Sequence, residues 1–98
     1  MYGIEPSVYT RLQTYFQSNE DIRSVILFGS RAKGLETSRS DIDLCIDYIG
    51  KHKGTVIFEI EDRVGIYDVD VVFQETLGEE LSAQIIRDGK QIYQKEES

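Results

Sequence analysis

Two apolar segments separated by a glycine-containing turn do most to limit the folds that this chain can adopt. Residues 24–28 (SVILF) form an apolar run that ends at Gly29, as expected of a strand that is covered on both faces. Residues 41–47 (DIDLCID) place apolar side chains at every second position, which is the period of a second strand. Buried strands avoid carboxylates, because removing water from a charge is costly. Asp41 and Asp43 therefore require a partner, and the turn upstream is the first place to look for it.

The rest of the chain predicts helices that alternate with strands. Apolar spacing indicates a helix over residues 6–18, a short helix over 30–33, a helix that includes 56–64 and a last helix over 79–88. In the last helix Leu81, Ile85 and Ile86 are expected to face inward. A third strand is expected over residues 67–73, and residues 91–93 are expected to form a short edge strand. We therefore predict one domain over residues 1–98 with an α/β (α+β) fold, in which helices pack on a single mixed sheet.

Charge and cysteine content narrow the class of protein. The 98 residues carry a formal net charge of −7, which argues against nucleic acid as the main partner, because binding its phosphates requires a basic surface. The single cysteine, Cys45, excludes an intrachain disulfide and fits a reducing compartment. No apolar run approaches the ~20 residues of a membrane span, and the N-terminus does not have the pattern of a signal peptide. We expect a complete cytoplasmic protein without a membrane partner; the sequence leaves homo- or hetero-oligomerisation open.

The turn and the acidic strand together predict a site for a nucleoside triphosphate and a metal ion. Asp41 and Asp43 share one face of their strand, and two such like charges repel each other unless a cation neutralises them. Mg²⁺ prefers carboxylate and phosphate oxygens, and Mn²⁺ is an alternative. Gly29 and Ser30 lie at a strand-to-helix turn, where backbone N–H groups can hold a phosphate. Cationic side chains follow this turn directly, at Arg31 and Lys33.

Phosphoryl transfer between two metal ions needs a further carboxylate, and the third strand offers two candidates. Asp68 and Asp70 share one face of the segment YDVDVVF. Asp70 lies among more apolar neighbours, where a charge most needs a partner, and Asp68 lies nearer to the strand start and to solvent. We therefore expect Asp70 to complete the metal site, while a shared role for Asp68 stays open.

These motifs resemble a known family. The pattern of Gly-Ser, ten residues and Asp-x-Asp, in the wording LFGSRAKG and SDIDL, is similar to the DNA polymerase β-like nucleotidyltransferase superfamily and its minimal, MntA-type branch. The segments VDVVF and IIRDGKQIY extend the likeness, so that it covers about residues 25–93. The resemblance implies that Gly29 and Ser30 hold the triphosphate of ATP, that Asp41 and Asp43 bind two Mg²⁺ ions, and that Asp70 completes the metal site and helps to activate the acceptor. It places Arg31 and Lys33 in the family's basic turn.

The resemblance also implies a partner. Larger relatives carry a helical domain that binds the acceptor, and this chain ends just after the core, so a separate four-helix HEPN/HepT-like protein is expected to supply it. We expect an Mg²⁺-dependent enzyme that transfers AMP from ATP to a hydroxyl of this partner, as the antitoxin of a toxin–antitoxin pair. Two alternatives stay open: transfer to a small molecule such as an aminoglycoside, and an antitoxin that acts by contact alone. The sequence does not identify the base or the acceptor.

Overall fold

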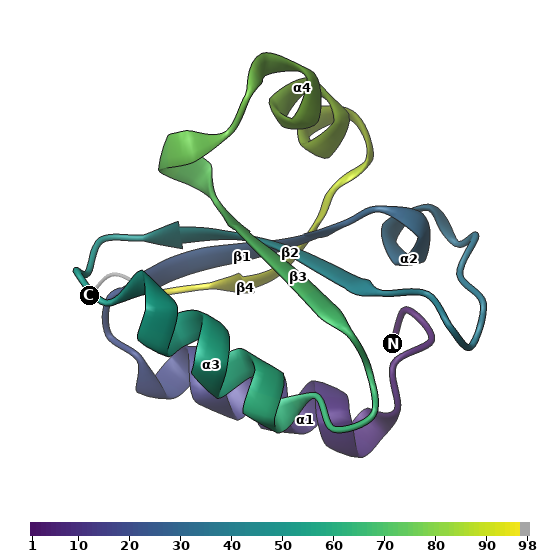
Figure 1. Ribbon diagram of the computed structural model, residues 1–98, viewed down its shortest axis with the longest axis horizontal. Helices are drawn as coiled ribbons and strands as arrows, with labels where there is room; N and C mark the ends of the chain where they lie inside the picture. Colours follow the sequence, from purple (N-terminus) through teal and green to yellow (C-terminus); the bar gives the residue numbers. More distant parts are fainter. Residues whose placement is uncertain (97–98) are drawn as a thin grey trace.

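The computed structural model describes residues 1–96 of the chain (Figure 1). Its elements alternate along the chain much as the apolar pattern predicts. In order they are α1 (Pro6–Ser18), β1 (Ile22–Phe28), α2 (Ser30–Lys33), β2 (Ile42–Tyr48), α3 (Lys53–Arg63), β3 (Val69–Phe73), the 3-10 turn η1 (Gln74–Thr76), α4 (Glu79–Asp88) and β4 (Lys90–Gln94). Among residues 1–96, no helix is both long and apolar enough to cross a membrane.

The four strands form one sheet in the order β3-β2-β1-β4. Strand β1 pairs antiparallel with both β2 and β4, and β2 pairs parallel with β3, so the predicted mixed sheet is confirmed. The apolar run of β1 therefore lies in the middle of the sheet, as its composition predicts. Strands β3 and β4 form the two edges.

Helices α1 and α3 cover one face of this sheet (Figure 1). The alternating residues Ile42, Leu44 and Ile46 of β2 are fully buried in the same core cluster as the apolar stripes of both helices. In α1 this stripe consists of Val8, Leu12, Tyr15 and Phe16. The main hydrophobic core thus lies between the sheet and this helix pair.

Helix α4 covers only the middle of the opposite face. There Phe28, Cys45 and Ile85 form a second, smaller cluster. The prediction that Ile86 faces inward is wrong, because its side chain is 82% exposed. Successive helical residues point about 100° apart, and the narrow contact of α4 with the sheet accommodates Ile85 but not its neighbour. The end of this face beside α2 is left uncovered by α4 (Figure 1).

Several element boundaries differ from the sequence-based prediction. Strand β3 begins at Val69 rather than at residue 67. Tyr67 is used elsewhere, since its hydroxyl accepts a hydrogen bond from the Glu5 amide and its ring lies against Arg31. Helix α3 begins at Lys53, several residues before the apolar stripe that identifies it. The apolar pattern does not reveal this start, because the first turn is polar.

Candidate active site

A sharp turn after β1 brings the main chain against a carboxylate of β2. Strand β1 ends at Phe28, and Gly29 adopts φ 75° and ψ −156° before α2 begins at Ser30. This conformation is essentially restricted to glycine. A Cβ atom at Gly29 would overlap the carboxylate of Asp43. Glycine is therefore required here on two grounds, the backbone angles and the close approach of Asp43.

A second carboxylate lies beside Asp43 on the neighbouring strand. Asp43 and Asp70 are register partners on the parallel strands β2 and β3, so their side chains leave the same face of the sheet. Asp41 lies one residue before β2 and is exposed. The sheet thus brings the three sequence-predicted carboxylates to one end of the face that α4 leaves open.

Burial does not single out Asp70. It is expected from its neighbours to be the more buried acid of β3, but Asp68 and Asp70 are both exposed, and the partly buried carboxylate is Asp43. The reason is the strand order: β3 is an edge strand, whereas β2 lies inside the sheet. The case for Asp70 therefore rests on its register with Asp43 and not on burial.

Burial, together with the neighbouring carboxylates, changes the protonation of Asp43. Burial raises the pKa of Asp43 from its usual 3.8 to about 6, and the nearby charges of Asp70 and Asp41 add to the rise, while Arg31 opposes it. The ionised form is thus penalised in the folded protein. A cation near these oxygens would remove the penalty.

The three carboxylates do not form a preassembled metal cage. Within the described residues 1–96, no group of three or more His, Cys, Asp or Glu side chains is close enough to hold an ion. Their chemistry nevertheless matches a hard divalent cation, because every donor is a carboxylate oxygen. The shared effect on the pKa of Asp43 also places them within electrostatic reach of one another.

Arg31, a sequence-based candidate for contact with the phosphates, is buried in the protein. Its side chain is only 1% exposed. The guanidinium donates hydrogen bonds to the carbonyl oxygens of Tyr2 at 3.2 Å and Ser40 at 2.8 Å, and it lies 5.1 Å from the ring centre of Tyr67. Because it is enclosed in this way, the guanidinium binds carbonyl oxygens of the protein's own backbone. Sequence analysis missed this role, since a basic residue after a Gly-Ser turn has the same signature in either case.

The other predicted residues surround the turn. Ser30 begins α2, and its carbonyl oxygen accepts the Leu35 amide at 2.9 Å. Lys33 is at the exposed end of α2, where its ammonium lies 3.9 Å from a carboxylate oxygen of Asp88 in α4. Asp68 is exposed, and its carbonyl oxygen accepts the Ile42 amide at 2.9 Å. Asp68 thus links the starts of β2 and β3 through its backbone.

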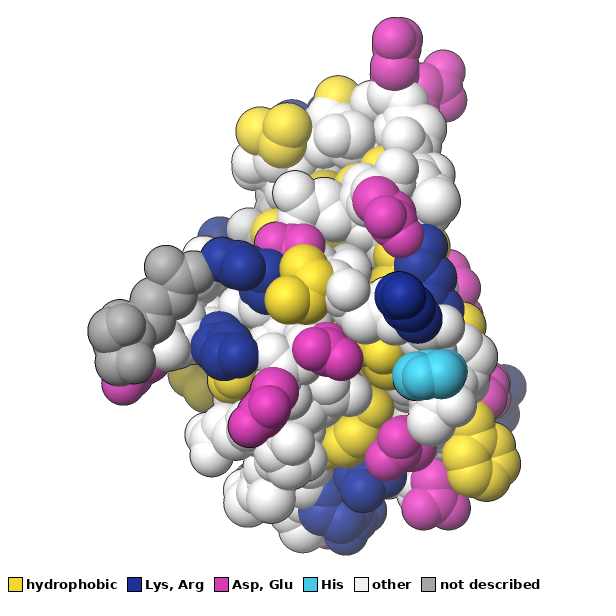
Figure 2. Space-filling view, turned by 90° about the vertical axis from the view of Figure 1, so that its left-hand side faces the viewer, with side chains coloured by type: hydrophobic (Ala, Val, Ile, Leu, Met, Phe, Trp, Pro, Cys, Tyr) yellow, Lys and Arg dark blue, Asp and Glu magenta, His cyan; other side chains and the backbone are white. Residues whose placement is uncertain are grey.

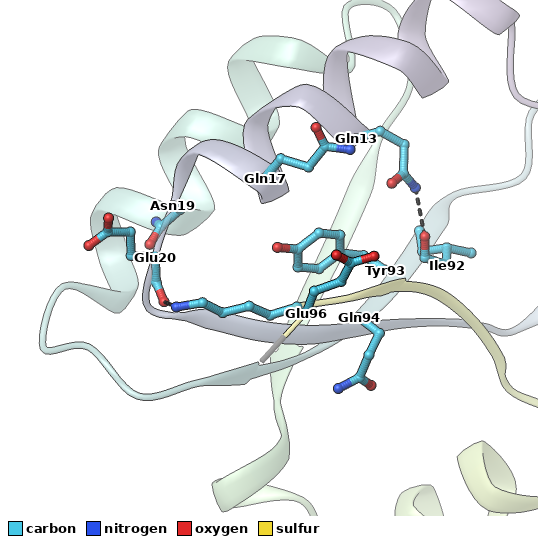
Figure 3. A pocket seen from close by; sticks show the side chains of 9 residues that line it. Gln13, Gln17, Asn19, Glu20, Ile92, Tyr93, Gln94 and Glu96 are labelled. Atoms are coloured by element: carbon cyan, nitrogen blue, oxygen red, sulfur yellow. Dashed lines mark hydrogen bonds between the residues drawn. The ribbon is translucent and has the colours of Figure 1, made fainter. Parts of the chain in front are cut away.

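The hollows on the helix side of the sheet lie beside hydrogen bonds that hold the fold together. One of about 610 Å³ lies between α1 and β4 (Figure 3). There Gln13 donates to the Ile92 carbonyl oxygen at 2.8 Å, and Lys95 donates to that of Glu20 at 2.7 Å. These bonds join the edge strand and the chain that follows it to the α1 side of the molecule. The hollow has no crowded carboxylates like those beside Gly29, so it is the poorer candidate for an active site.

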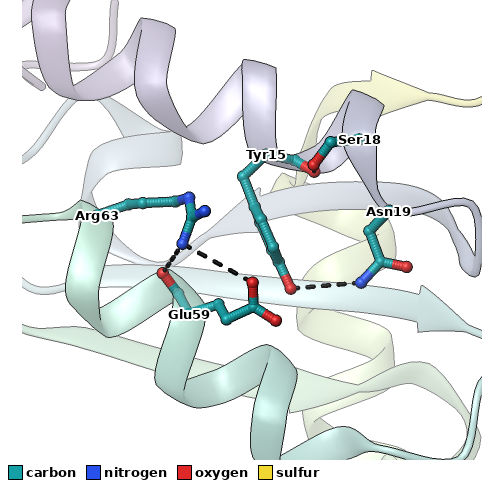
Figure 4. Close-up of polar contacts among 5 residues, drawn as sticks. All are labelled: Tyr15, Ser18, Asn19, Glu59 and Arg63. Carbon is teal, nitrogen blue, oxygen red and sulfur yellow. Dashed lines mark hydrogen bonds and ion pairs between the residues drawn. The ribbon is translucent and has the colours of Figure 1, made fainter.

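A polar group between α1 and α3 joins those two helices (Figure 4). The Arg63 guanidinium lies 4.5 Å from the ring centre of Tyr15, donates to the Glu59 carbonyl oxygen at 2.9 Å and is 3.9 Å from the Glu59 carboxylate. The Tyr15 hydroxyl accepts a hydrogen bond from Asn19 at 3.3 Å.

At the end of the molecule away from α2, acidic and basic side chains are interspersed around the only histidine, His52 (Figure 2).

The chain is similar to known nucleotidyltransferases. The family model "Polymerase beta, Nucleotidyltransferase" matches residues 10–98. A crystal structure of a toxin–antitoxin with AMP-PNP has a TM-score of 0.72 at 22% identity, over 89% of this chain and 73% of that chain. A tri-AMPylated HEPN toxin from Shewanella oneidensis in complex with MNT antitoxin gives 0.62 at 18% identity, over 90% and 71%. A nucleotidyltransferase structure from Sulfolobus solfataricus gives 0.54 at 23% identity, over 89% and 77%. At these identities the solved structures establish a common fold. No curated protein matches the sequence.

Proposed function

Because this chain belongs to the polymerase β nucleotidyltransferase family, we propose that it transfers AMP from ATP to a hydroxyl group of a HEPN-type helical protein. The observation that carries this proposal is the arrangement beside Gly29. A glycine turn, a partly buried carboxylate and its cross-strand acidic neighbour meet at one open end of the sheet. This combination suits a substrate that brings phosphate groups and a divalent cation together.

The proposed roles follow from position. Asp41, Asp43 and Asp70 would hold Mg²⁺, since a cation among them would offset the cost of keeping the Asp43 carboxylate ionised. When bound, Mg²⁺ supplies charge neutralisation at the phosphate oxygens. The main chain at Gly29 and Ser30 would hold the triphosphate, because no side chain at position 29 obstructs its approach. Lys33 would add a cationic contact after a small rearrangement away from Asp88.

The chemical step replaces a phosphoanhydride bond of ATP by a phosphoester bond to the acceptor. The acceptor oxygen attacks the α-phosphorus of ATP, the bond from that phosphorus to the oxygen bridging to the β-phosphate breaks, and pyrophosphate leaves. The acceptor's proton must be taken up as its oxygen forms the new bond. Asp70 is the proposed acceptor of this proton, because its exposed carboxylate lies at the sheet edge, where an incoming protein can reach it.

The proposed partner rests on the structural neighbours. One of them is described with AMP-PNP, and another consists of an AMPylated HEPN toxin with its MNT antitoxin. An antitoxin that acts by contact alone is the main rival. It would have no need for Asp43, whose ionised form is penalised in the folded protein. A small-molecule acceptor is the other alternative, and the acceptor assay separates it from both.

The test is the intact mass of a co-purified HEPN-type protein after incubation with this chain, ATP and Mg²⁺. We expect the partner's mass to increase by whole AMP units with the wild type and to stay unchanged with Asp43→Asn. Asp47→Asn is the matched control, since Asp47 lies on the same strand and face but at the other end of the sheet. A stable complex whose partner gains no mass, although ATP and Mg²⁺ are present, would favour the contact-only antitoxin.

A further inference from the structure

Arg31 is a buried cation that the described residues do not pair directly with a carboxylate. Its side chain is only 1% exposed, it forms no ion pair within the described chain, and its Nε atom has no hydrogen-bond partner there. Burying a charge is costly unless it is paired or fully hydrogen-bonded. The chain therefore carries a cost at this position that packing alone does not explain.

The guanidinium contacts three segments that are distant from one another in sequence. It donates to the carbonyl oxygen of Tyr2 near the N-terminus and to that of Ser40, and it lies over the ring of Tyr67. Ser40 directly precedes Asp41, and Tyr67 directly precedes Asp68. Arg31 itself directly follows Ser30 of the glycine-serine turn. One side chain thus joins the turn to the loops that lead into β2 and β3.

Asp41 depends on this connection more than Asp43 does. Asp43 lies inside β2 and is held by pairing on both sides, with β1 and with β3. Asp41 lies one residue outside the strand, and the 2.8 Å bond from Arg31 to the Ser40 carbonyl oxygen holds the peptide unit that joins Ser40 to Asp41. Without that bond the loop before β2 loses a charge-assisted hydrogen bond, which is stronger than a neutral one.

We propose that Arg31 is a positioning residue, which fixes the loop bearing Asp41 relative to the Gly29-Ser30 turn. The inference rests on the proposed nucleotidyl transfer, but its structural part stands without it. Arg31 also lies near enough for its charge to lower the pKa of Asp43 against the larger opposing effects. A single buried guanidinium therefore connects the expected phosphate-binding and metal-binding halves of the site.

The test compares Arg31→Met and Arg31→Lys with Arg63→Met. Arg63 is the matched control, since it also lies over a tyrosine ring and donates to a carbonyl oxygen, but between α1 and α3 (Figure 4). Arg31→Lys keeps the charge but replaces the planar fork by one ammonium, and it serves as the folded variant if Arg31→Met does not fold. All measurements are made well below the melting temperature of each variant.

The first readout is amide hydrogen exchange and requires no activity. In Arg31→Met the amide of Ile42, which pairs with Asp68 at the start of the two strands, should exchange about 10-fold faster. The amide of Val64, which is bonded to Ile60 at the end of α3, should keep its wild-type rate. Equal acceleration at both amides, or none at Ile42, would overturn the positioning role.

The second readout is the kinetics of AMP transfer. We expect kcat to fall by about 100-fold in Arg31→Met with little change in the KM for ATP, since a displacement near 1 Å is enough for such a loss. Arg31→Lys should recover part of kcat, and Arg63→Met should keep all of it. Wild-type kcat in the folded Arg31→Met protein would contradict the inference. A wild-type protein that transfers nothing would refute the proposed function instead. The hydrogen-exchange rates would then be the test of whether Arg31 positions the loop that bears Asp41.

Discussion

Replacing Asp43 by Asn should stabilise the metal-free protein, which is unusual for a partly buried polar residue. The substitution keeps the shape of the side chain and removes its charge. Burial and the carboxylates of Asp70 and Asp41 raise the pKa of Asp43 to about 6, so the folded state disfavours the ionised form. The wild type carries this penalty at neutral pH, and Asp43→Asn does not.

The pKa shift sets the size of this effect. The rise from 3.8 to about 6 amounts to roughly two pKa units, and at 1.36 kcal/mol per unit it corresponds to at most about 3 kcal/mol. The side chain is only partly buried, so solvent screening reduces this figure. We expect a gain of about 1 kcal/mol in the free energy of unfolding at pH 7.5, which raises the Tm of a domain of this size by about 4–8 °C.

The sign of the pH dependence follows from the same shift. Above about pH 6 Asp43 is ionised in the folded and unfolded states, and the folded protein carries the whole penalty. Between about pH 6 and 4 the folded state binds the proton more tightly, so the wild type gains stability as the pH falls. Below about pH 4 both states are protonated and the penalty is gone. The advantage of Asp43→Asn should thus be full at pH 7.5 and lost near pH 4.

Urea denaturation in EDTA at pH 7.5, 5 and 4 measures this difference between variant and wild type. Comparison at each pH cancels the titration of groups that the two proteins share. Asp47→Asn serves as the control, because it removes a charge from the same strand and face away from the acidic group. A destabilised Asp43→Asn at pH 7.5, or a difference between the two proteins that does not change with pH, would refute the electrostatic reasoning.

Three further predictions concern the turn, the third carboxylate and the metal ion. Gly29→Ala should lower the free energy of unfolding by about 1–3 kcal/mol in urea denaturation. Gly34→Ala is the control: Gly34 shares the positive φ but has open space at its Cβ, so the substitution should cost only about 1 kcal/mol. Asp70→Asn should lower AMP transfer by about 100-fold yet still bind Mg-ATP, whereas Asp68→Asn should keep most activity; the reverse result would assign the role to Asp68. Calorimetry should show ATP binding at least ~10-fold weaker in EDTA, a difference of about 1.4 kcal/mol, and equal affinities would rule out the metal site.

The sequence predicts the strands and the turn well, because local patterns determine them. The apolar run of β1, the alternation of β2 and the glycine between β1 and α2 are each visible within a few residues. The meeting of Asp43 with Asp70 needs one further fact, the parallel pairing of β2 with β3. Hydrophobic periodicity does not supply that fact, and the resemblance to a known family implies only that Asp70 belongs to the same site as Asp43.

The features that the sequence does not reveal depend on long-range packing. The exposure of Asp70 follows from the edge position of β3, and no pattern within β3 identifies an edge strand. The burial of Arg31 depends on Tyr2 and Tyr67, which lie 29 residues before it and 36 after it, and sequence spacing does not predict that contact. Ile86 is exposed because α4 covers only the middle of its sheet face.

Isotope transfer from ATP tests the central claim most directly. The HEPN-type partner is incubated with this chain, Mg²⁺ and ATP that carries its label on either the α- or the γ-phosphate. We predict that the α-label enters the partner protein, that the γ-label leaves with pyrophosphate, and that Asp43→Asn eliminates the incorporation. Incorporation of the γ-label would mean phosphate transfer rather than AMP transfer. Absence of both labels from a partner that binds this chain would contradict the account.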